Sequence, residues 1–430
     1  MKKIKGNTTP HKTTQIKAGS ALLSLALLAS ACGSSSSSGS STKSVSASAK
    51  QTIVFAAGGL GSEGTATKTA IAGFEKLHPN ITVKLLPLSS SSSSAKQQLT
   101  QSFIAGSSTP DVFYTDVIWP PSFAKAGWLM PLNKFHPNSS AFFSGEVKAG
   151  QYNGKTYAVP WFINAEGVYY RKDLIPTPPS TPAQLVADAK MAMAKDKSIT
   201  TGLAFEGAKY EGAVTAFINF LGGFGGKLNP SNLNTPANKK ALTFMHNTIY
   251  SYHISPQAVT GWQEPNVQSA YLNGSAAFAM NWPYLFALAE KPGSIVAGKT
   301  GWIPFPSATG TPQAALGGDM LAINAKSTHS AAAWEFIKYL QSPSVQTQRA
   351  ISAGDPPALK SAYNSSLYSK APYYKQEKAV FKYATPRPIT PAYPQISSDL
   401  QTMISSTLSN QGTPGALLKS TAAQLKTIKG

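Results

Sequence analysis

The chain has 430 residues, of which 42% are hydrophobic, so it is long enough for two domains with separate cores and is not a disordered chain. Charged residues make up only 13%, and 38 basic against 18 acidic residues give a net charge of +20. The lysines are scattered and the only arginines are Arg171, Arg349 and Arg387, which argues against a nucleic-acid-binding protein, and a single cysteine excludes a disulfide framework and a multi-cysteine zinc site.

The positive charge arises as much from missing carboxylates as from added lysines. Carboxylates that are ionised in a folded protein take up protons at low pH, and this destabilises the fold. The composition is therefore typical of a surface exposed to acid. The hypothesis predicts no sharp loss of stability between about pH 5 and pH 3.

The N-terminus has the pattern of an exported lipoprotein. Residues 1–17 carry five lysines and precede an apolar stretch over residues 18–31, which is shorter than the roughly 20 residues of a membrane-spanning helix. This pattern predicts a signal peptide over residues 1–31. The small residues before Cys32 resemble a bacterial lipobox, although Ala29 stands where Leu is usual, and they predict that Cys32 is lipidated after cleavage.

Residues 32–50 are rich in Ser and Gly, which predicts a flexible tether between the lipid and the body of the protein. We therefore expect an extracytoplasmic protein held at the cell membrane, on its outer face or periplasmic side, by the lipid alone.

The body alternates short apolar runs with segments of helical periodicity. Strands are predicted over residues 52–57, 81–88 and 111–115, with helices between them that include residues 70–77 and 95–105. This order predicts an α/β fold with parallel strands. Further predictions are a hairpin over residues 152–157 and helices over residues 182–195, 236–252, 331–340 and 414–428.

Two nucleotide-binding patterns fail in their context. Gly59–Gly64 matches GxGxxG, but the second strand lacks the acidic residue that would bind a ribose. Gly293–Thr300 matches a phosphate loop, but prolines flank it and prevent the helix that the motif requires.

No GxSxG, HExxH or metal-like histidine spacing occurs, so the sequence predicts a protein that is not an enzyme and has no cofactor or metal. An exported glycoside hydrolase remains an alternative, because it needs only two suitably placed carboxylates.

The chain is rich in aromatic residues, with seven Trp, seventeen Tyr and nineteen Phe. Several stand near small polar groups in predicted loops: Asp116 with Trp119, Trp161 with Asn164, and the run Asn281–Tyr284. Flat rings suit the apolar face of a sugar, and carboxylate, amide and guanidinium groups suit its hydroxyls. These pairs indicate carbohydrate binding.

Several segments together resemble the extracellular solute-binding proteins (family 1) of ABC sugar importers, and most closely the trehalose/maltose type. The segments are Pro110–Asp116, Ala126–Leu132, Gly154–Trp161, Tyr169–Leu174, Gly222–Gly226, Asn281–Tyr284, Ala332–Ile337 and Pro386–Pro388. The resemblance extends from about Ile53 to the C-terminus.

This resemblance implies a two-lobed periplasmic-binding-protein fold of the type II-like kind, with crossing segments as a hinge. Lobe 1 is expected over residues 51–160 and about 316–345, and lobe 2 over residues 161–315 and about 346–430. The implied function is to capture a disaccharide such as trehalose or maltose between the lobes and deliver it to the transmembrane subunits of an ABC permease. The implied protein is a monomer. A different oligosaccharide or a polyol phosphate is the alternative ligand.

The resemblance and the aromatic–polar pairs suggest these ligand-binding residues: Glu63, Asp116, Trp119, Trp161, Asn164, Trp282, Tyr284, Gly317, Gly318, Asp319 and Arg387. Trp282 and Tyr284 match a stacking pair, and Arg387 matches a hydroxyl-binding arginine. Asn164 stands where the related proteins often have Asp, and Asp319 where an aromatic residue is common. An acid in place of a ring favours hydrogen bonding over stacking.

Overall fold

The computed structural model describes residues 49–429. The predicted signal peptide, Cys32 and all but the end of the predicted tether lie outside the described residues. Within the described part of the chain, no helix combines the length and the apolar character needed to cross a membrane.

The first sheet starts with the predicted alternation of strands and helices. β1 (Gln51–Ala57) pairs in parallel with both β2 (Ile81–Pro87) and β3 (Val112–Asp116). The helices α1 (Glu63–Leu77) and α2 (Ser92–Ile104) connect these strands in turn. Parallel strands require such crossovers, so the α/β prediction for this part of the chain is confirmed.

Three more strands complete the first sheet. β11 (Ala314–Ile323) pairs antiparallel with β3 and with β6 (Ala158–Ala165), and its first residues pair in parallel with β12 (Ala384–Thr385). The helix α10 (Ser330–Leu340) packs on β1 and β11, and its apolar residues Trp334, Ile337 and Leu340 are buried. The strand order is β12-β11-β3-β1-β2, with β6 beside β11.

The second sheet has the order β10-β7-β9-β8. Its strands are β7 (Gly167–Arg171), β8 (Thr201–Ala204), β9 (Ala276–Asn281) and β10 (Thr300–Ile303). The helices α5 (Pro182–Lys195) and α8 (Glu264–Leu272) pack against β8 and β9.

A group of four helices accompanies the second sheet: α6 (Glu211–Gly223), α7 (Pro236–Tyr250), α14 (Tyr393–Leu408) and α15 (Pro414–Leu425). They pack on one another, and every residue of α6 is buried. The predicted helices over residues 182–195, 236–252 and 414–428 are thereby confirmed, with ends that differ by up to three residues.

The remaining α-helices and strands of the described residues have between 2 and 11 residues. They are α3 (Pro120–Lys125), α4 (Ser144–Ala149), β4 (Gln151–Tyr152), β5 (Lys155–Thr156), α9 (Tyr284–Ala289), α11 (Pro343–Ala353), α12 (Ser365–Lys370) and α13 (Tyr374–Phe381). β4 and β5 form the predicted hairpin, and both turn residues, Asn153 and Gly154, have positive φ, as a tight Asn-Gly turn requires.

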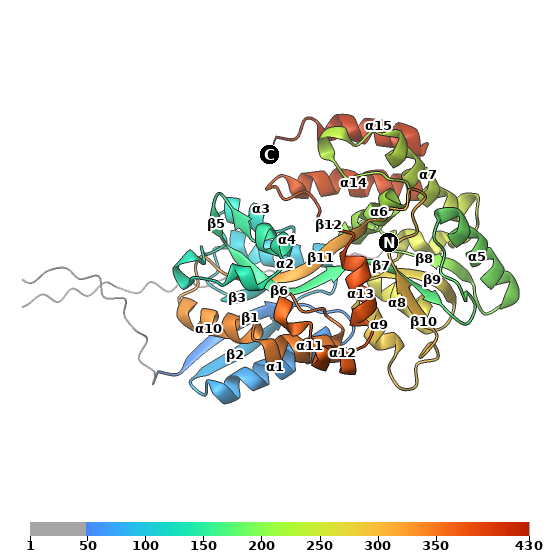
Figure 1. Ribbon diagram of the computed structural model, residues 1–430. Coiled ribbons are helices and arrows are strands. Elements are labelled where there is room, and N and C mark those ends of the chain that lie inside the picture. The colour runs from blue at the N-terminus through green and yellow to red at the C-terminus, as the bar shows by residue number, and fades with distance from the viewer. Residues whose placement is uncertain (1–48, 430) are drawn as a thin grey trace, which may run out of the picture. The chain divides into compact units, whose positions relative to one another are not determined.

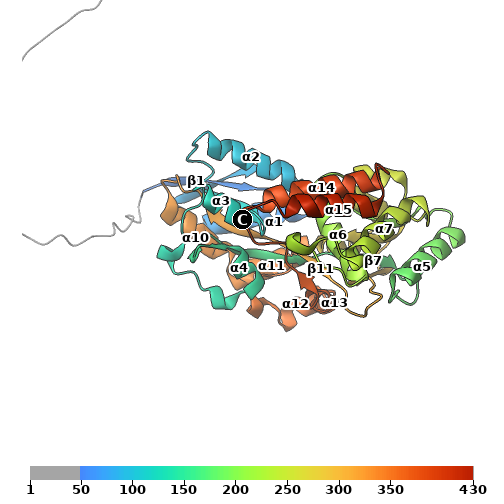
Figure 2. The same ribbon diagram turned by 90° about the horizontal axis from the view of Figure 1, so that it is seen from above.

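Two strands connect the sheets. β6 of the first sheet leads through Glu166 directly into β7 of the second, and β11 returns the chain to the first sheet after β10. β6 and β11 pair antiparallel along most of their length. Figures 1 and 2 show the two sheets with their helices on either side of this pair of strands. The two-lobed α/β fold is therefore confirmed, while the predicted residue boundaries of the lobes stay a prediction.

Candidate ligand-binding site

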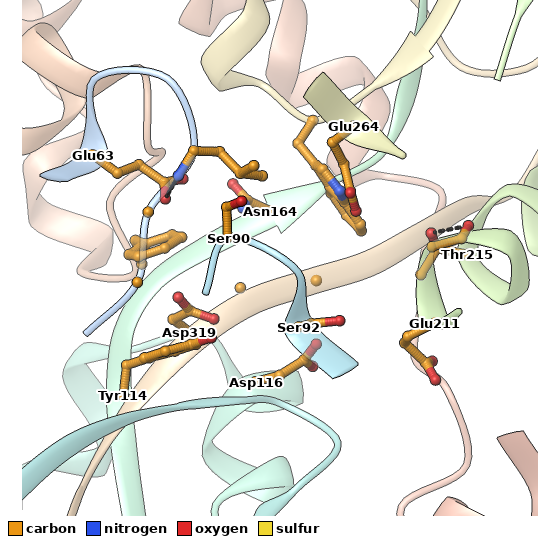
Figure 3. Close-up of a pocket in the computed structure, with 18 of the residues that line it drawn as sticks. Glu63, Ser90, Ser92, Tyr114, Asp116, Asn164, Glu211, Thr215, Glu264 and Asp319 are labelled. Carbon is orange, nitrogen blue, oxygen red and sulfur yellow. Dashed lines mark hydrogen bonds between the residues drawn. The ribbon is translucent and has the colours of Figure 1, made fainter. Parts of the chain in front are cut away.

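A cavity with about 690 Å³ of space between the protein atoms, part of it open to solvent, lies where the two sheets meet. Its wall comes from the loops after β1, β2 and β9, the ends of β3 and β6, the centre of β11, and the first turns of α6 and α8. Ligands of open α/β sheets bind beyond the carboxyl ends of the strands, as they would here. Figure 3 shows this cavity in close-up, with residues that line it drawn as sticks.

The cavity brings together eight of the eleven residues predicted from the sequence. These are Glu63, Asp116, Asn164, Trp282, Gly317, Gly318, Asp319 and Arg387. They are up to 324 positions apart in the chain (387 − 63), so their convergence is a property of the fold.

The other three predicted residues do not line the cavity in this structure, and their role as ligand contacts stays a prediction. Trp119 is 2% exposed and packs against Tyr114, at 5.5 Å between ring centroids. Trp161 is 2% exposed, with the guanidinium of Arg349 lying 4.1 Å from its ring centroid. Tyr284 is 1% exposed at the start of α9. Each ring is enclosed by protein, and Trp119 and Trp161 pack against the wall residues Tyr114 and Phe162.

Arg387 connects the two sides of the cavity. Its guanidinium donates to Asp116 of β3 and to Glu211 of α6, both at 2.9 Å. Glu211 also accepts hydrogen bonds from the hydroxyls of Tyr393 and Ser397 on α14. Burial raises the pKa of Asp116, and Arg387 acts against this shift. The arginine therefore neutralises carboxylates from both lobes.

Glu63 lies at the first position of α1 and is buried to 7% exposure. Its Oε2 accepts a 2.6 Å hydrogen bond from the backbone N–H of Leu60. Burial, followed by the nearby carboxylate of Asp355, raises the pKa of Glu63 well above its usual value. The predicted acid at the helix start therefore faces the cavity with one oxygen already bonded.

Glycines in β11 allow the indole of Trp282 to lie against the strand. A Cβ at Gly317 would come within 2.6 Å of the Trp282 ring. Gly318 has φ +123°, where other residues are strained, and a Cβ there would come within 2.7 Å of Glu146 Oε1. Trp282 itself is half-buried and follows β9 directly. Its ring is available for stacking on a ligand.

Sequence reasoning missed several residues of the wall: Ser89, Ser90, Ser92, Tyr114, Phe162, Glu211, Thr215 and Glu264. Strand periodicity could have found two of them. Tyr114 lies two positions before Asp116 and Phe162 two positions before Asn164, so each shares a strand face with a predicted residue. The other signal is an acid at the first position of a helix, as Glu211 and Glu264 are.

The wall offers five carboxyl groups, one guanidinium, several hydroxyls and a half-buried indole. Such a set suits a compound with many hydroxyls and an apolar face. Among the described residues, no group of three or more His, Cys, Asp or Glu is placed to hold a metal ion.

Comparisons with known proteins agree with this geometry. The sequence matches the protein family described as bacterial extracellular solute-binding protein over residues 57–347. It is 32% identical to a probable ABC transporter-binding protein of Deinococcus radiodurans, over 81% of this chain and 87% of that protein. A maltotriose-binding protein of Pyrococcus abyssi is 28% identical over 59% of this chain and 56% of its own.

Solved structures give the same result. The maltose-bound MalE3 of T. maritima superimposes with a TM-score of 0.83 at 34% identity, covering 87% of this chain and 99% of that one. The GacH receptor of Streptomyces glaucescens, solved unliganded and with acarbose, has a TM-score of 0.79 at 25% identity, covering 88% and 100%. The chain therefore belongs to the extracellular solute-binding proteins (family 1) of ABC transporters, in their sugar-binding branch.

Proposed function

We propose that this protein captures a disaccharide such as trehalose or maltose outside the cytoplasm and delivers it to the permease of an ABC importer. The observation that carries the proposal is the cavity itself, whose wall combines Trp282 with carboxyl groups from both lobes. The sugars in the names of the relatives, maltose and maltotriose, support the same class of ligand.

The hinge gives the proposed function its mechanism. Glu63, Asp116 and Asp319 belong to the first lobe, whereas Glu264 and Trp282 belong to the second. A sugar that contacts both groups binds the closed form better than the open form, and this shifts the population towards closure. No covalent step is needed, because the closed form only has to dock on the permease and reopen there.

The lipid anchor on Cys32 and the monomeric state belong to the same proposal. Lipidation would keep the binding protein close to its permease, and a single cleft needs no second copy. A polyol phosphate is disfavoured as the ligand, because five carboxyl groups of the wall face one arginine.

Isothermal titration calorimetry against trehalose, maltose, maltotriose and sucrose tests the proposal. We expect saturable binding of at least one sugar and a higher melting temperature in its presence, because a ligand that binds only the folded state stabilises it. The sugar should be recovered intact after incubation, whereas released monosaccharide would indicate a glycoside hydrolase. Failure of all four sugars to bind or to raise the melting temperature would contradict the proposal.

A further inference from the structure

Two acidic side chains lie opposite each other in the wall of the cleft. Asp116 of β3 and Asp319 of β11 are partners in the antiparallel register. The Cβ atoms of such a pair lie about 4.5–5.5 Å apart on one face of the sheet, and like charges there are destabilising. Both residues line the cavity, and Figure 3 shows them with Glu63 along one side of it. When ionised, this pair needs a positive charge close by.

The buried arginines near this pair already have carboxylate partners. Arg387 donates to Asp116 and to a second carboxylate, at 2.9 Å each. Arg349 forms a 2.8 Å ion pair with Asp355. No hydrogen bond or ion pair between described residues involves the carboxyl oxygens of Asp319. Burial, and next the charge of Asp116, raises the pKa of Asp319 well above its usual value.

Lys96 on α2 does not supply the missing charge. It is close enough for Glu211 and Asp116 to act on it, but neither of these carboxyl groups forms an ion pair with it. It forms no ion pair with another described residue, and it does not line the cavity.

Other carboxyl and amide oxygens of the wall have no hydrogen-bond partner among the described residues. Glu264 is 8% exposed, and its Oε2 has no hydrogen-bond partner among the described residues. The Oδ1 of Asn164, on β6 of the first sheet, is likewise buried without a partner among the described residues. A sugar hydroxyl donates one hydrogen bond and also accepts, whereas an ammonium group donates three and accepts none. A wall with several unpartnered oxygens is therefore better matched by a ligand that carries many hydrogen-bond donors.

We propose that Asp319 and Asp116 form a subsite for a protonated amino group, so that the natural ligand is a carbohydrate carrying a basic amine. This inference rests on the proposed function and names its ligand class. The indole of Trp282 takes the apolar face of the sugar, and the carboxylates of the first lobe bind its amine through charge-assisted hydrogen bonds, which are stronger than neutral ones.

Calorimetry on the wild-type protein at pH 7 tests this directly. The probes are trehalose and maltose, each compared with its derivatives in which one hydroxyl at a time is replaced by an amine. We expect at least one amino derivative to bind about tenfold or more tightly than its parent sugar. The preference should shrink at about 0.5 M NaCl, because salt screens the attraction between the charges.

Asp319→Asn keeps the shape of the side chain and removes its charge. The ratio of amino-sugar to parent-sugar affinity should fall to about one in this variant. Glu335→Gln is the matched control, because Glu335 is an acid with 43% exposure that pairs with Lys338 on α10, away from the cavity lining. It should keep the wild-type ratio.

The outcomes separate this inference from the proposed function. If neutral sugars bind and no amino derivative binds better, the inference is wrong and the proposed function stands. If the preference persists in Asp319→Asn, the subsite does not depend on Asp319. If no sugar of either kind binds, the proposed function fails, and the inference fails with it. Should Asp319→Asn not fold, the wild-type ratio and its salt dependence decide the question.

Discussion

Two groups of carboxyl groups, each with at least one member in the wall of the cleft, differ in how their charge is balanced. In the first, Arg387 pairs with Asp116 and Glu211, so every member has a partner of opposite charge. The second consists of Glu166, Glu206 and Glu264, which are buried close enough together to act on one another, and of which Glu264 lines the cavity.

No ion pair with a described residue involves the second group. Both oxygens of Glu166 and of Glu206 lack hydrogen-bond partners there. A carboxyl group buried without a cation is favoured in its protonated, neutral form. The contribution of the first group to stability therefore depends on Arg387, and the contribution of the second group depends on pH.

The largest expected effect is the loss of Arg387. Arg387→Met would leave Asp116 and Glu211 buried without their cation and should lower the free energy of unfolding by about 3–5 kcal/mol. Urea denaturation followed by circular dichroism measures this. The control is Lys338→Ala, whose partner Glu335 is largely exposed, and it should cost less than about 1 kcal/mol. An equal loss of unfolding free energy in the two variants would contradict the expected difference between a buried and an exposed ion pair.

The second prediction concerns the pH dependence of stability. Burial raises the pKa of Glu166 to about 7, and Glu206, Glu264, Tyr210, Thr215 and Asn219 face it. A folded-state pKa above the unfolded one means that the folded protein binds more protons between these values. The stability is therefore fully present below about pH 4.5 and is lost as pH rises through 7, by roughly 1–3 kcal/mol.

Urea denaturation between pH 5 and pH 8 checks this slope. Glu166→Gln removes the titrating group and should flatten the profile and raise stability at the alkaline end. Glu335→Gln should leave the slope unchanged. A wild-type protein that grows more stable from pH 5 to pH 8 would contradict the account of the second group.

The same comparison refines the hypothesis of a surface exposed to acid. Nine carboxyl groups are buried: Glu63, Asp111, Glu146, Glu166, Glu206, Glu211, Glu264, Asp355 and Glu377. Since the chain has only 18 acidic residues, half of them are removed from the surface. Few ionised carboxylates are left there to take up protons, so the hypothesis still predicts no sharp loss of stability between about pH 5 and pH 3.

The sequence predicted the fold well because its signals are local. Hydrophobic periodicity marks strands and helices within ten or fifteen residues, and the helix over residues 182–195 agrees with the structure at both ends. Burial of an individual ring is not a local property. Trp161 and Trp282 look alike in the sequence, yet one is enclosed by Phe55 and Arg349 and the other is half-buried beside Gly317.

The charge balance of the site also lies beyond the sequence. Nothing in the sequence distinguishes Glu166 and Glu206 from other acidic residues between predicted elements. Only the fold shows that they are buried together. Conversely, the pairing of Arg387 with Glu211 joins residues 176 positions apart, which no spacing rule predicts.

The third prediction tests whether the second lobe, which contains the uncompensated carboxyl group Glu264, also holds the sugar. Trp282→Ala removes the half-buried indole from the wall and should weaken sugar binding about tenfold, because the apolar contact with the ring is lost. Isothermal titration calorimetry gives the change in Kd. Unchanged affinity would mean that the sugar lies against the first lobe only.

The smallest expected effect belongs to Tyr284→Phe, which is matched to Trp282→Ala. The two residues are two positions apart and both were predicted to stack on the ligand, but Tyr284 is enclosed by protein and does not line the cavity. Its hydroxyl has no hydrogen-bond partner among the described residues, so removing it breaks no bond seen there. We expect a Kd within about twofold of wild type, since an unpartnered buried hydroxyl can be replaced at little cost. A large loss of affinity by calorimetry would mean that the hydroxyl of Tyr284 reaches the sugar when the lobes close, and Tyr284 would then belong to the wall of the cavity.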